Sequence, residues 1–213
     1  MAGPNAAFWQ QRFEQGQTPW DRGQASPQLK AWIDEGVLRG GQRILVPGCG
    51  RGWEVVALAA LGAEVTAVDL APAALAACAK QLQDAGLQAT LVEGDLLQWQ
   101  PAQGFDRIYE QTCLCAIHPD LWVPYAQRLR GWLQPGGQLA LLAAQVPRAG
   151  AQQGLIEGPP YHLDINAVRA LFPSDRWGWP RPPYARVLPP EIPGLATHIA
   201  ARSAELALLL TRR

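Results

Sequence analysis

Three glycines and one acid occur where a bound small molecule could approach the main chain and find a carboxylate. They are Gly48, Gly50, Gly52 and Asp69. The apolar residues 43–47 predict a buried strand before the glycines, residues 51–61 a helix, and residues 64–69 a second strand that ends at the acid. Glycine lets a ligand approach the backbone closely, and a carboxylate at this place accepts hydrogen bonds from ribose hydroxyls. The pattern indicates the first half of a nucleotide-binding α/β fold.

The spacing of the glycines narrows the class of nucleotide. A dinucleotide fingerprint requires Gly-x-Gly-x-x-Gly, whereas here the third glycine comes one residue early and Trp53 takes its place. No Gly-Lys-Ser/Thr follows, which excludes a P-loop. Gly-x-Gly-x-Gly with an acid about twenty residues later resembles the class I methyltransferases that use S-adenosylmethionine (SAM). A tight turn without any ligand and, more remotely, a nicotinamide dehydrogenase are the alternatives.

Length and composition predict one globular domain over residues 1–213, with a hydrophobic fraction of 48%. The 18 basic and 18 acidic side chains give a formal net charge of zero, so we expect no nucleic-acid or membrane partner. The apolar runs are too short for a transmembrane helix, and the N-terminus lacks the pattern of a signal peptide. Four cysteines do not make a disulfide framework. A cytoplasmic location is the simplest interpretation.

Strands and helices alternate along the middle of the chain, which predicts a parallel sheet with helices on both faces. The expected strands are 43–47, 64–69, 88–92, 106–110 and 138–144, and the expected helices between them are 51–61, 71–84 and 119–133. Further helices are expected at 5–14, 26–35 and 164–172, with Asn5, Ser26 and Asp164 at their starts. Residues 173–193 are rich in proline and tryptophan and predict an irregular excursion, and residues 198–210 predict a closing antiparallel strand. The expected fold is the Rossmann-like class I methyltransferase fold, a mainly parallel seven-stranded sheet with an antiparallel last strand.

Four segments resemble the thiopurine S-methyltransferase family, in particular its halide/thiol methyltransferase branch. They are residues 8–21, which begin with Phe-Trp and end in Thr-Pro-Trp-Asp; Val-Pro-Gly-Cys-Gly at 46–50; Cys-Leu-Cys-Ala-Ile-His-Pro at 113–119; and Gly-Pro-Pro-Tyr at 158–161. Their order and spacing are similar to the family's along most of the chain. The resemblance implies an N-terminal helical lid over residues 1–35 and a substrate-side insertion over residues 145–193.

The resemblance also implies roles in a SAM site. The cofactor-binding residues would be Trp9, Phe13 and Trp20 on the lid, Gly48, Gly50 and Asp69 at the methionine and ribose parts, Gly94 and Asp95 at the adenine, and Glu110 and Gln111 beside the sulfonium. Tyr161 would face the methyl-transfer site as the catalytic residue. Structural alternatives remain open: the lid aromatics could be core residues, Asp69 could cap a helix, Asp95 could form a turn, and Tyr161 could belong to a rigid turn.

Methyl transfer from SAM requires few chemical groups from the protein. A sulfonium is an activated methyl donor, so the site needs alignment and exclusion of water, and we expect no metal. The single Cys113-Leu114-Cys115 pair is poor evidence for zinc, and we expect small buried thiols there. Exocyclic-amine methyltransferases carry Asp/Asn-Pro-Pro-Tyr where this chain has Glu110-Gln111-Thr112-Cys113, which disfavours amine methylation.

The expected acceptor is a small soft nucleophile: a thiol, sulfide, halide, thiopurine, or a selenium or tellurium species. We expect a monomer or weak homodimer whose partner is this small-molecule acceptor. A small-molecule O-methyltransferase and a catalytically silent SAM-binding module are the alternatives.

Overall fold

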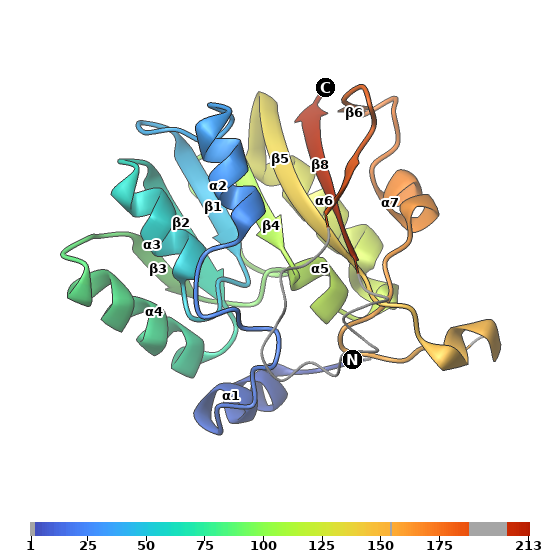
Figure 1. Ribbon diagram of the computed structural model, residues 1–213, viewed down its shortest axis with the longest axis horizontal. Helices are drawn as coiled ribbons and strands as arrows, with labels where there is room; N and C mark the ends of the chain where they lie inside the picture. The colour runs from blue at the N-terminus through green and yellow to red at the C-terminus, as the bar shows by residue number, and fades with distance from the viewer. Residues whose placement is uncertain (1–2, 154, 188–203) are drawn as a thin grey trace.

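The computed structural model of the chain describes residues 3–153, 155–187 and 204–213. Its strands are β1 (Arg43–Pro47), β2 (Glu64–Asp69), β3 (Thr90–Glu93), β4 (Phe105–Gln111), β5 (Leu133–Gln145), β6 (Trp177–Gly178), β7 (Ala185–Val187) and β8 (Ala204–Arg212). They form a mixed sheet in the order β3-β2-β1-β4-β5-β8-β6 (Figure 1). β1 to β5 run parallel to one another, whereas β8 is antiparallel to β5. The predicted Rossmann-like sheet with an antiparallel last strand is confirmed.

β6 and β7 share the outer edge of β8. Trp177 of β6 pairs with Arg212 near one end of β8, and Val187 of β7 pairs with Glu205 near the other. The prediction of a wholly irregular excursion over 173–193 is therefore wrong for these two segments, because the open backbone edge of β8 pairs with them. Residues 188–193 of that excursion, and residues 198–203 of the predicted final strand, lie outside the described residues.

Seven helices accompany the sheet in the described part of the chain. They are α1 (Ala6–Glu14), α2 (Pro27–Asp34), α3 (Trp53–Ala60), α4 (Pro72–Asp84), α5 (Cys113–Ala116), α6 (Trp122–Trp132) and α7 (Ile165–Leu171), with short 3₁₀ turns η1 (Pro119–Leu121) and η2 (Ala149–Gln153). The predicted helix over 119–133 begins as η1 and continues as α6. None of the described helices is both long and apolar enough to cross a membrane.

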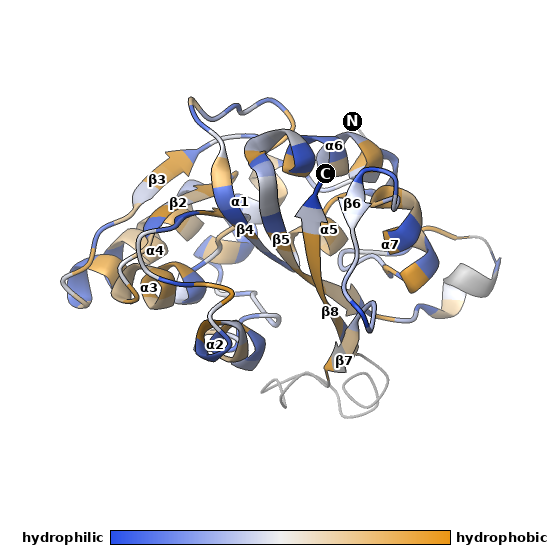
Figure 2. Ribbon diagram, turned by 90° about the horizontal axis from the view of Figure 1, so that it is seen from above, coloured by the Kyte–Doolittle hydropathy of each residue, from blue (hydrophilic) through white to orange (hydrophobic). Residues whose placement is uncertain are grey.

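Helices cover both faces of the sheet, with α2, α3 and α4 on one side and α6 and α7 on the other (Figure 2). Successive strand residues point to opposite faces, so Ile44 and Val46 enter the core under α2 to α4, and Leu45 enters the core under α6 and α7. Strands buried on both faces are apolar at every position, which explains the continuous apolar runs in the sequence.

The N-terminal residues divide between the core and the edge of the sheet. α2 buries Leu29 and Trp32 against the sheet, whereas α1 has no buried residue and lies beyond the edge at which β4 ends (Figure 1). Of the predicted lid over 1–35, only α1 and the segment that follows it therefore lie over this edge. α2 packs in the core because its apolar residues form one stripe.

Candidate functional site

The glycine loop connects β1 to α3 through three residues in the left-handed backbone region. Gly48, Gly50 and Gly52 have φ values of +60°, +54° and +84°. A Cβ on Gly48 would lie 2.8 Å from the Cys113 sulfur, and one on Gly52 would lie 2.8 Å from the Cys78 Cβ. At Gly50 the nearest group is instead the Phe13 ring, at 3.7 Å. Packing thus requires two of the glycines, while Gly50 faces the N-terminal segment.

Asp69, the last residue of β2, holds this loop in place. Its Oδ2 accepts a hydrogen bond from the Gly50 N–H at 2.9 Å, and its Oδ1 accepts one from the Ala71 N–H at 2.9 Å. The side chain is buried, and burial raises the pKa of the carboxyl, although the backbone N–H groups oppose the shift. Ala71 is the N-cap of α4 and the helix has no side-chain cap, so Asp69 bonds the residue that precedes the helix and the capping alternative is not observed. Each carboxylate oxygen keeps a second lone pair, so the ribose role stays a prediction.

Gly94 and Asp95 lie at the adjacent strand end. The Gly94 N–H donates to the Asp69 carbonyl at 3.0 Å, which brings the two predicted cofactor residues of β2 and β3 together. The Asp95 carboxylate accepts from the Leu97 N–H at 2.9 Å and so forms a turn. Contact of these residues with an adenine remains a prediction.

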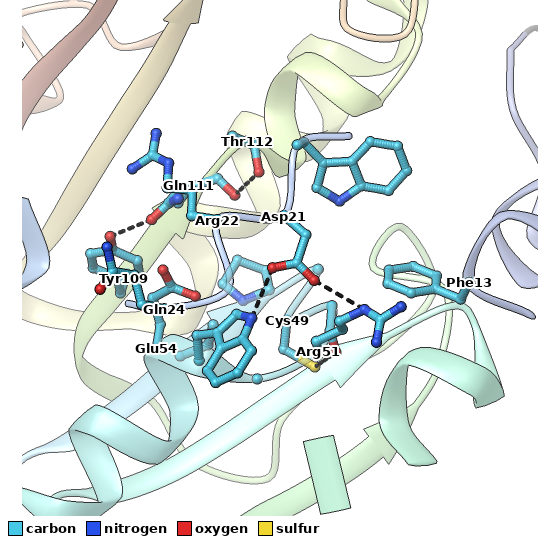
Figure 3. A pocket seen from close by; sticks show the side chains of 17 residues that line it. Phe13, Asp21, Arg22, Gln24, Cys49, Arg51, Glu54, Tyr109, Gln111 and Thr112 are labelled. Atoms are coloured by element: carbon cyan, nitrogen blue, oxygen red, sulfur yellow. Dashed lines mark hydrogen bonds and ion pairs between the residues drawn. The ribbon is translucent and has the colours of Figure 1, made fainter. Parts of the chain in front are cut away.

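A pocket opens between the glycine loop and the N-terminal segment (Figure 3). Its side chains and backbone come from Phe13, Trp20, Asp21, Arg22, Gln24, residues 46–54, Tyr109, Gln111 and Thr112. Among the predicted residues, Phe13, Trp20, Gly48, Gly50 and Gln111 line it, whereas Trp9, Asp69, Gly94, Asp95, Glu110 and Tyr161 do not. The structure thus brings together the predicted lid, the glycine loop and the end of β4.

Two aromatic rings, Phe13 and Trp20, line this pocket, and a third, Trp9, packs on Trp20. Trp20 meets Trp9 edge-on at 5.7 Å between ring centroids and Phe13 edge-on at 6.1 Å. Such geometry stabilises an aromatic cluster beyond the area that it buries. Trp9 contacts Trp20 but does not line the pocket, and its predicted contact with SAM stays a prediction.

Asp21 was not singled out from the sequence, although it ends the Thr-Pro-Trp-Asp segment. Its Oδ1 accepts hydrogen bonds from the Trp53 indole N–H and the Gly23 N–H, both at 2.8 Å. Its Oδ2 lies 3.0 Å from Nε of Arg51. Asp21 therefore joins the N-terminal segment to the first residues after the glycine loop (Figure 3).

Arg22, the next residue, anchors the same segment to β8. Its Nη2 donates to Oε1 of Glu205 at 2.6 Å, and the two side chains are 7% and 6% exposed. Its Nη1 donates to the Ser26 hydroxyl at 3.1 Å. Glu54 completes this polar group by accepting from the Ser26 N–H at 3.1 Å, and burial raises the pKa of its carboxyl. No sequence signal pointed to Glu205, which is 183 residues from its partner.

The end of β4 presents Glu110 and Gln111 to opposite faces of the sheet, as neighbours in a strand must be. Gln111 lines the pocket, and its Oε1 accepts from the Tyr109 hydroxyl at 2.5 Å. Glu110 is fully buried, and its Oε1 accepts from the Leu114 N–H of α5 at 2.6 Å. Burial raises the pKa of Glu110 to about 8, so near neutral pH it is mostly a neutral acid. Gln111 therefore lines the pocket and Glu110 does not, and the predicted place of either side chain beside a sulfonium remains a prediction.

Tyr161 lies beyond the pocket, against α5. Its N–H donates to the Cys115 carbonyl at 2.7 Å, its ring meets His118 edge-on at 5.4 Å, and burial raises the pKa of its hydroxyl. A Cβ on Gly158 would overlap the Tyr161 ring, so the Gly-Pro-Pro turn packs directly on it. Cys113 and Cys115 are buried in α5, as expected. The structure supports the turn alternative and leaves a catalytic role of Tyr161 as a prediction.

The residues present fit SAM at the points that the structure shows. Gly50 faces the Phe13 ring, Asp69 lies at the end of the neighbouring strand, and Phe13 and Trp20 line the pocket together with polar and charged side chains. Aromatic faces attract a cationic sulfonium. These features make a site in which a nucleotide-linked cation could be held away from water.

Comparisons with known proteins show the family of this chain. The family model described as thiopurine S-methyltransferase matches residues 4–210. The chain is 34% identical over 175 residues to a protein named probable thiol methyltransferase 2 of Arabidopsis thaliana, covering 81% of this chain and 74% of that protein. It is 33% identical over 167 residues to thiocyanate methyltransferase 1 of the same plant, covering 77% and 70%.

A solved structure supports the fold. The 1,6-didemethyltoxoflavin-N1-methyltransferase of Burkholderia thailandensis, solved with S-adenosylhomocysteine, matches with a TM-score of 0.70 at 19% identity, over 97% of this chain and 86% of that one. At this identity the likeness concerns the fold alone, whereas the family match covers nearly all of the sequence. The chain therefore belongs to the thiopurine S-methyltransferase family of SAM-dependent methyltransferases.

Proposed function

We propose that this protein transfers the methyl group of SAM to a small, soft nucleophile, namely a thiol, sulfide, halide, thiopurine, or selenium or tellurium species. The observation that carries the proposal is the pocket between the glycine loop and the aromatic wall of Phe13 and Trp20. Two relatives are named as a probable thiol methyltransferase and a thiocyanate methyltransferase, and these names support the same class of acceptor.

Gly50 and Asp69 would hold the methionine and ribose parts of SAM, with Phe13 and Trp20 against its cationic end. When bound, SAM supplies a methyl group already activated by a sulfonium. The residues of this chain then need to orient the donor and the acceptor in line and keep water out. Soft nucleophiles such as thiolates gain reactivity when they lose their hydration shell, which suits a pocket with an aromatic wall.

The setting of the reaction is part of the proposal. All four cysteines are free and buried, which is compatible with a reducing cytoplasm. We expect a monomer or weak homodimer that needs no nucleic acid or membrane. Size-exclusion chromatography with light scattering tests the first expectation.

Methyl-labelled SAM tests the reaction against bisulfide, methanethiol, an aromatic thiol, a thiopurine, iodide, thiocyanate, selenite and tellurite, with a phenol as control. Label in a volatile or S-methylated product supports the proposal and ranks the acceptors. Transfer to the phenol alone contradicts it and indicates a small-molecule O-methyltransferase. SAM binding without transfer to any acceptor also contradicts it and indicates a silent binding module.

A further inference from the structure

Two hydrogen-bond donors that line the pocket are each oriented by a buried partner. The first is the guanidinium of Arg22, which lies between Glu205 and Ser26. One N–H of each terminal nitrogen is used in these contacts, and a guanidinium carries five in total. Glu205 is 4% exposed, so the pair is shielded from competing water. The remaining N–H groups of Arg22 are consequently held in one geometry beside the pocket.

The second donor is the side-chain amide of Gln111. Its Oε1 already accepts the Tyr109 hydroxyl, a contact visible as a dashed line in Figure 3. Tyr109 is fully buried, and burial raises the pKa of its hydroxyl, so it stays protonated and continues to donate. An amide whose oxygen is occupied offers its two N–H groups to a ligand. Because Tyr109 occupies the amide oxygen of Gln111, the amide NH₂ group is the part of Gln111 that remains available in the pocket.

The other charged side chains of the pocket are already paired. Asp21 lies against Arg51 and also accepts from the Trp53 indole. Glu54 accepts from the Ser26 N–H, and the pKa of its carboxyl is raised by burial. Asp21 and Glu54 thus each accept at least one contact within the protein, whereas the contacts of Arg22 and Gln111 leave N–H groups unused. Unused donors favour a ligand that only accepts hydrogen bonds.

We propose that Arg22 and Gln111 together bind one small anionic group, and that Glu205 and Tyr109 are the positioning residues for these two donors. The proposal rests on the proposed function and adds a subsite to it. Because Glu205 neutralises Arg22, the subsite acts through directed N–H donors more than through net positive charge. A singly charged group suits it better than a phosphate. The anion comes either from the α-carboxylate of SAM or from an anionic acceptor.

Two variants test the proposal without leaving a buried charge unpaired. Arg22→Lys keeps the positive charge beside Glu205 but loses the planar fork of N–H donors. Tyr109→Phe releases the Gln111 amide while keeping the ring. Tyr125→Phe is the matched control, because Tyr125 is also a fully buried tyrosine but lies on α6, on the other face of the sheet. Thermal melting establishes that each variant is folded.

Calorimetry then measures two kinds of binding in each protein. The first arm compares SAM with decarboxylated SAM, and the second titrates thiocyanate into the complex with S-adenosylhomocysteine. If the carboxylate is the anion, both variants weaken SAM by roughly tenfold and leave decarboxylated SAM unchanged, as expected for one charge-assisted hydrogen bond. If the acceptor is the anion, the loss appears with thiocyanate and not with SAM. Either result supports the subsite and identifies its source.

Three other results would contradict the proposed subsite. If Arg22→Lys and Tyr109→Phe bind SAM and thiocyanate as the wild type does, the subsite is wrong while the proposed function stands. Equal losses for SAM and decarboxylated SAM, with thiocyanate unaffected, also overturn it, because they show a general effect on packing. If the wild-type protein binds no form of SAM, both the subsite and the proposed function fail.

Discussion

The Asp69 carboxylate accepts a hydrogen bond from the Gly50 N–H at 2.9 Å, so the acid that ends β2 fixes the loop that follows β1. Gly50 is the glycine of this loop that faces Phe13. The acid proposed to bind the ribose therefore also shapes the backbone proposed to bind the methionine part. A change at Asp69 should affect both ends of that site together.

We expect Asp69→Ala to weaken SAM binding by at least about tenfold, because the variant loses both the ribose acceptor and the Gly50 contact. Isothermal calorimetry measures the dissociation constant. Asp84→Ala is the control, since Asp84 is an acid on α4 whose side chain is 62% exposed and pairs with Lys80. Near-normal affinity in Asp69→Ala would contradict the ribose assignment.

Glu110→Gln should change how stability depends on pH. The pKa of Glu110 is about 8 in the fold, against an ordinary value of 4.5. Between these values the unfolded chain has lost a proton that the folded chain retains, so Glu110 lowers stability progressively as the pH rises, and the effect levels off above about pH 8. Glutamine can still accept from the Leu114 N–H but does not titrate.

Thermal melting from pH 5 to pH 9 measures how the stability difference between Glu110→Gln and the wild type changes with pH. The stability of Glu110→Gln relative to the wild type should increase across the range and then level off. Glu64→Gln is the control, because the Glu64 side chain is 73% exposed. Parallel curves for the wild type and Glu110→Gln would mean that Glu110 is ionised in the fold at neutral pH.

Tyr161→Phe should slow turnover while SAM binding is preserved. The ring is held by the Gly158 turn and by a backbone contact to Cys115, so loss of the hydroxyl leaves the fold in place. A hydroxyl that contacts the reacting groups contributes on the order of 1.4 kcal/mol, or about tenfold in kcat. Steady-state kinetics with the best acceptor measures kcat, and calorimetry measures SAM affinity. An unchanged kcat would assign Tyr161 to the structure of the turn alone.

Gly52→Ala should destabilise the protein more than Gly86→Ala. Both glycines have positive φ, +84° and +66°, so both substitutions strain the backbone by about 1–2 kcal/mol. Only at Gly52 would the new Cβ meet Cys78, whereas Gly86 has open space. Overpacking should add about 1–3 kcal/mol to the loss in the free energy of unfolding. Urea denaturation measures both variants, and equal losses would show that Cys78 moves aside.

Local features of the fold were predictable from the sequence. β1 and β2 begin and end at the predicted residues, because apolar runs bounded by turns are strong local signals. Asn5, Ser26 and Asp164 accept hydrogen bonds from the first N–H groups of their helices, as expected, since capping depends only on neighbouring residues. The short helix α5 was missed, because it depends on the buried Glu110 carboxylate, four residues before Leu114.

The composition of the site was predictable only in part. Five of the residues named from the resemblance line the pocket, namely Phe13, Trp20, Gly48, Gly50 and Gln111. The separation of Glu110 from Gln111 follows from the alternation of a strand, but which of them faces the pocket depends on how the sheet packs between its helices. Asp21 ends segment 8–21, one of the four segments that carry the resemblance. Its ion pair with Arg51 forms because the N-terminal chain folds back over the glycine loop.

By itself, the sequence determined the alternation of strands and helices, the glycine loop followed by an acid, and through its motifs the family. These depend on residues close together in the chain, where hydrophobic periodicity and backbone preference act directly. Only the tertiary structure decided that Arg22 meets Glu205 and that Tyr109 orients Gln111. A buried ion pair or hydrogen bond forms where strand register and helix packing bring two groups out of water together, and that geometry is a property of the whole fold.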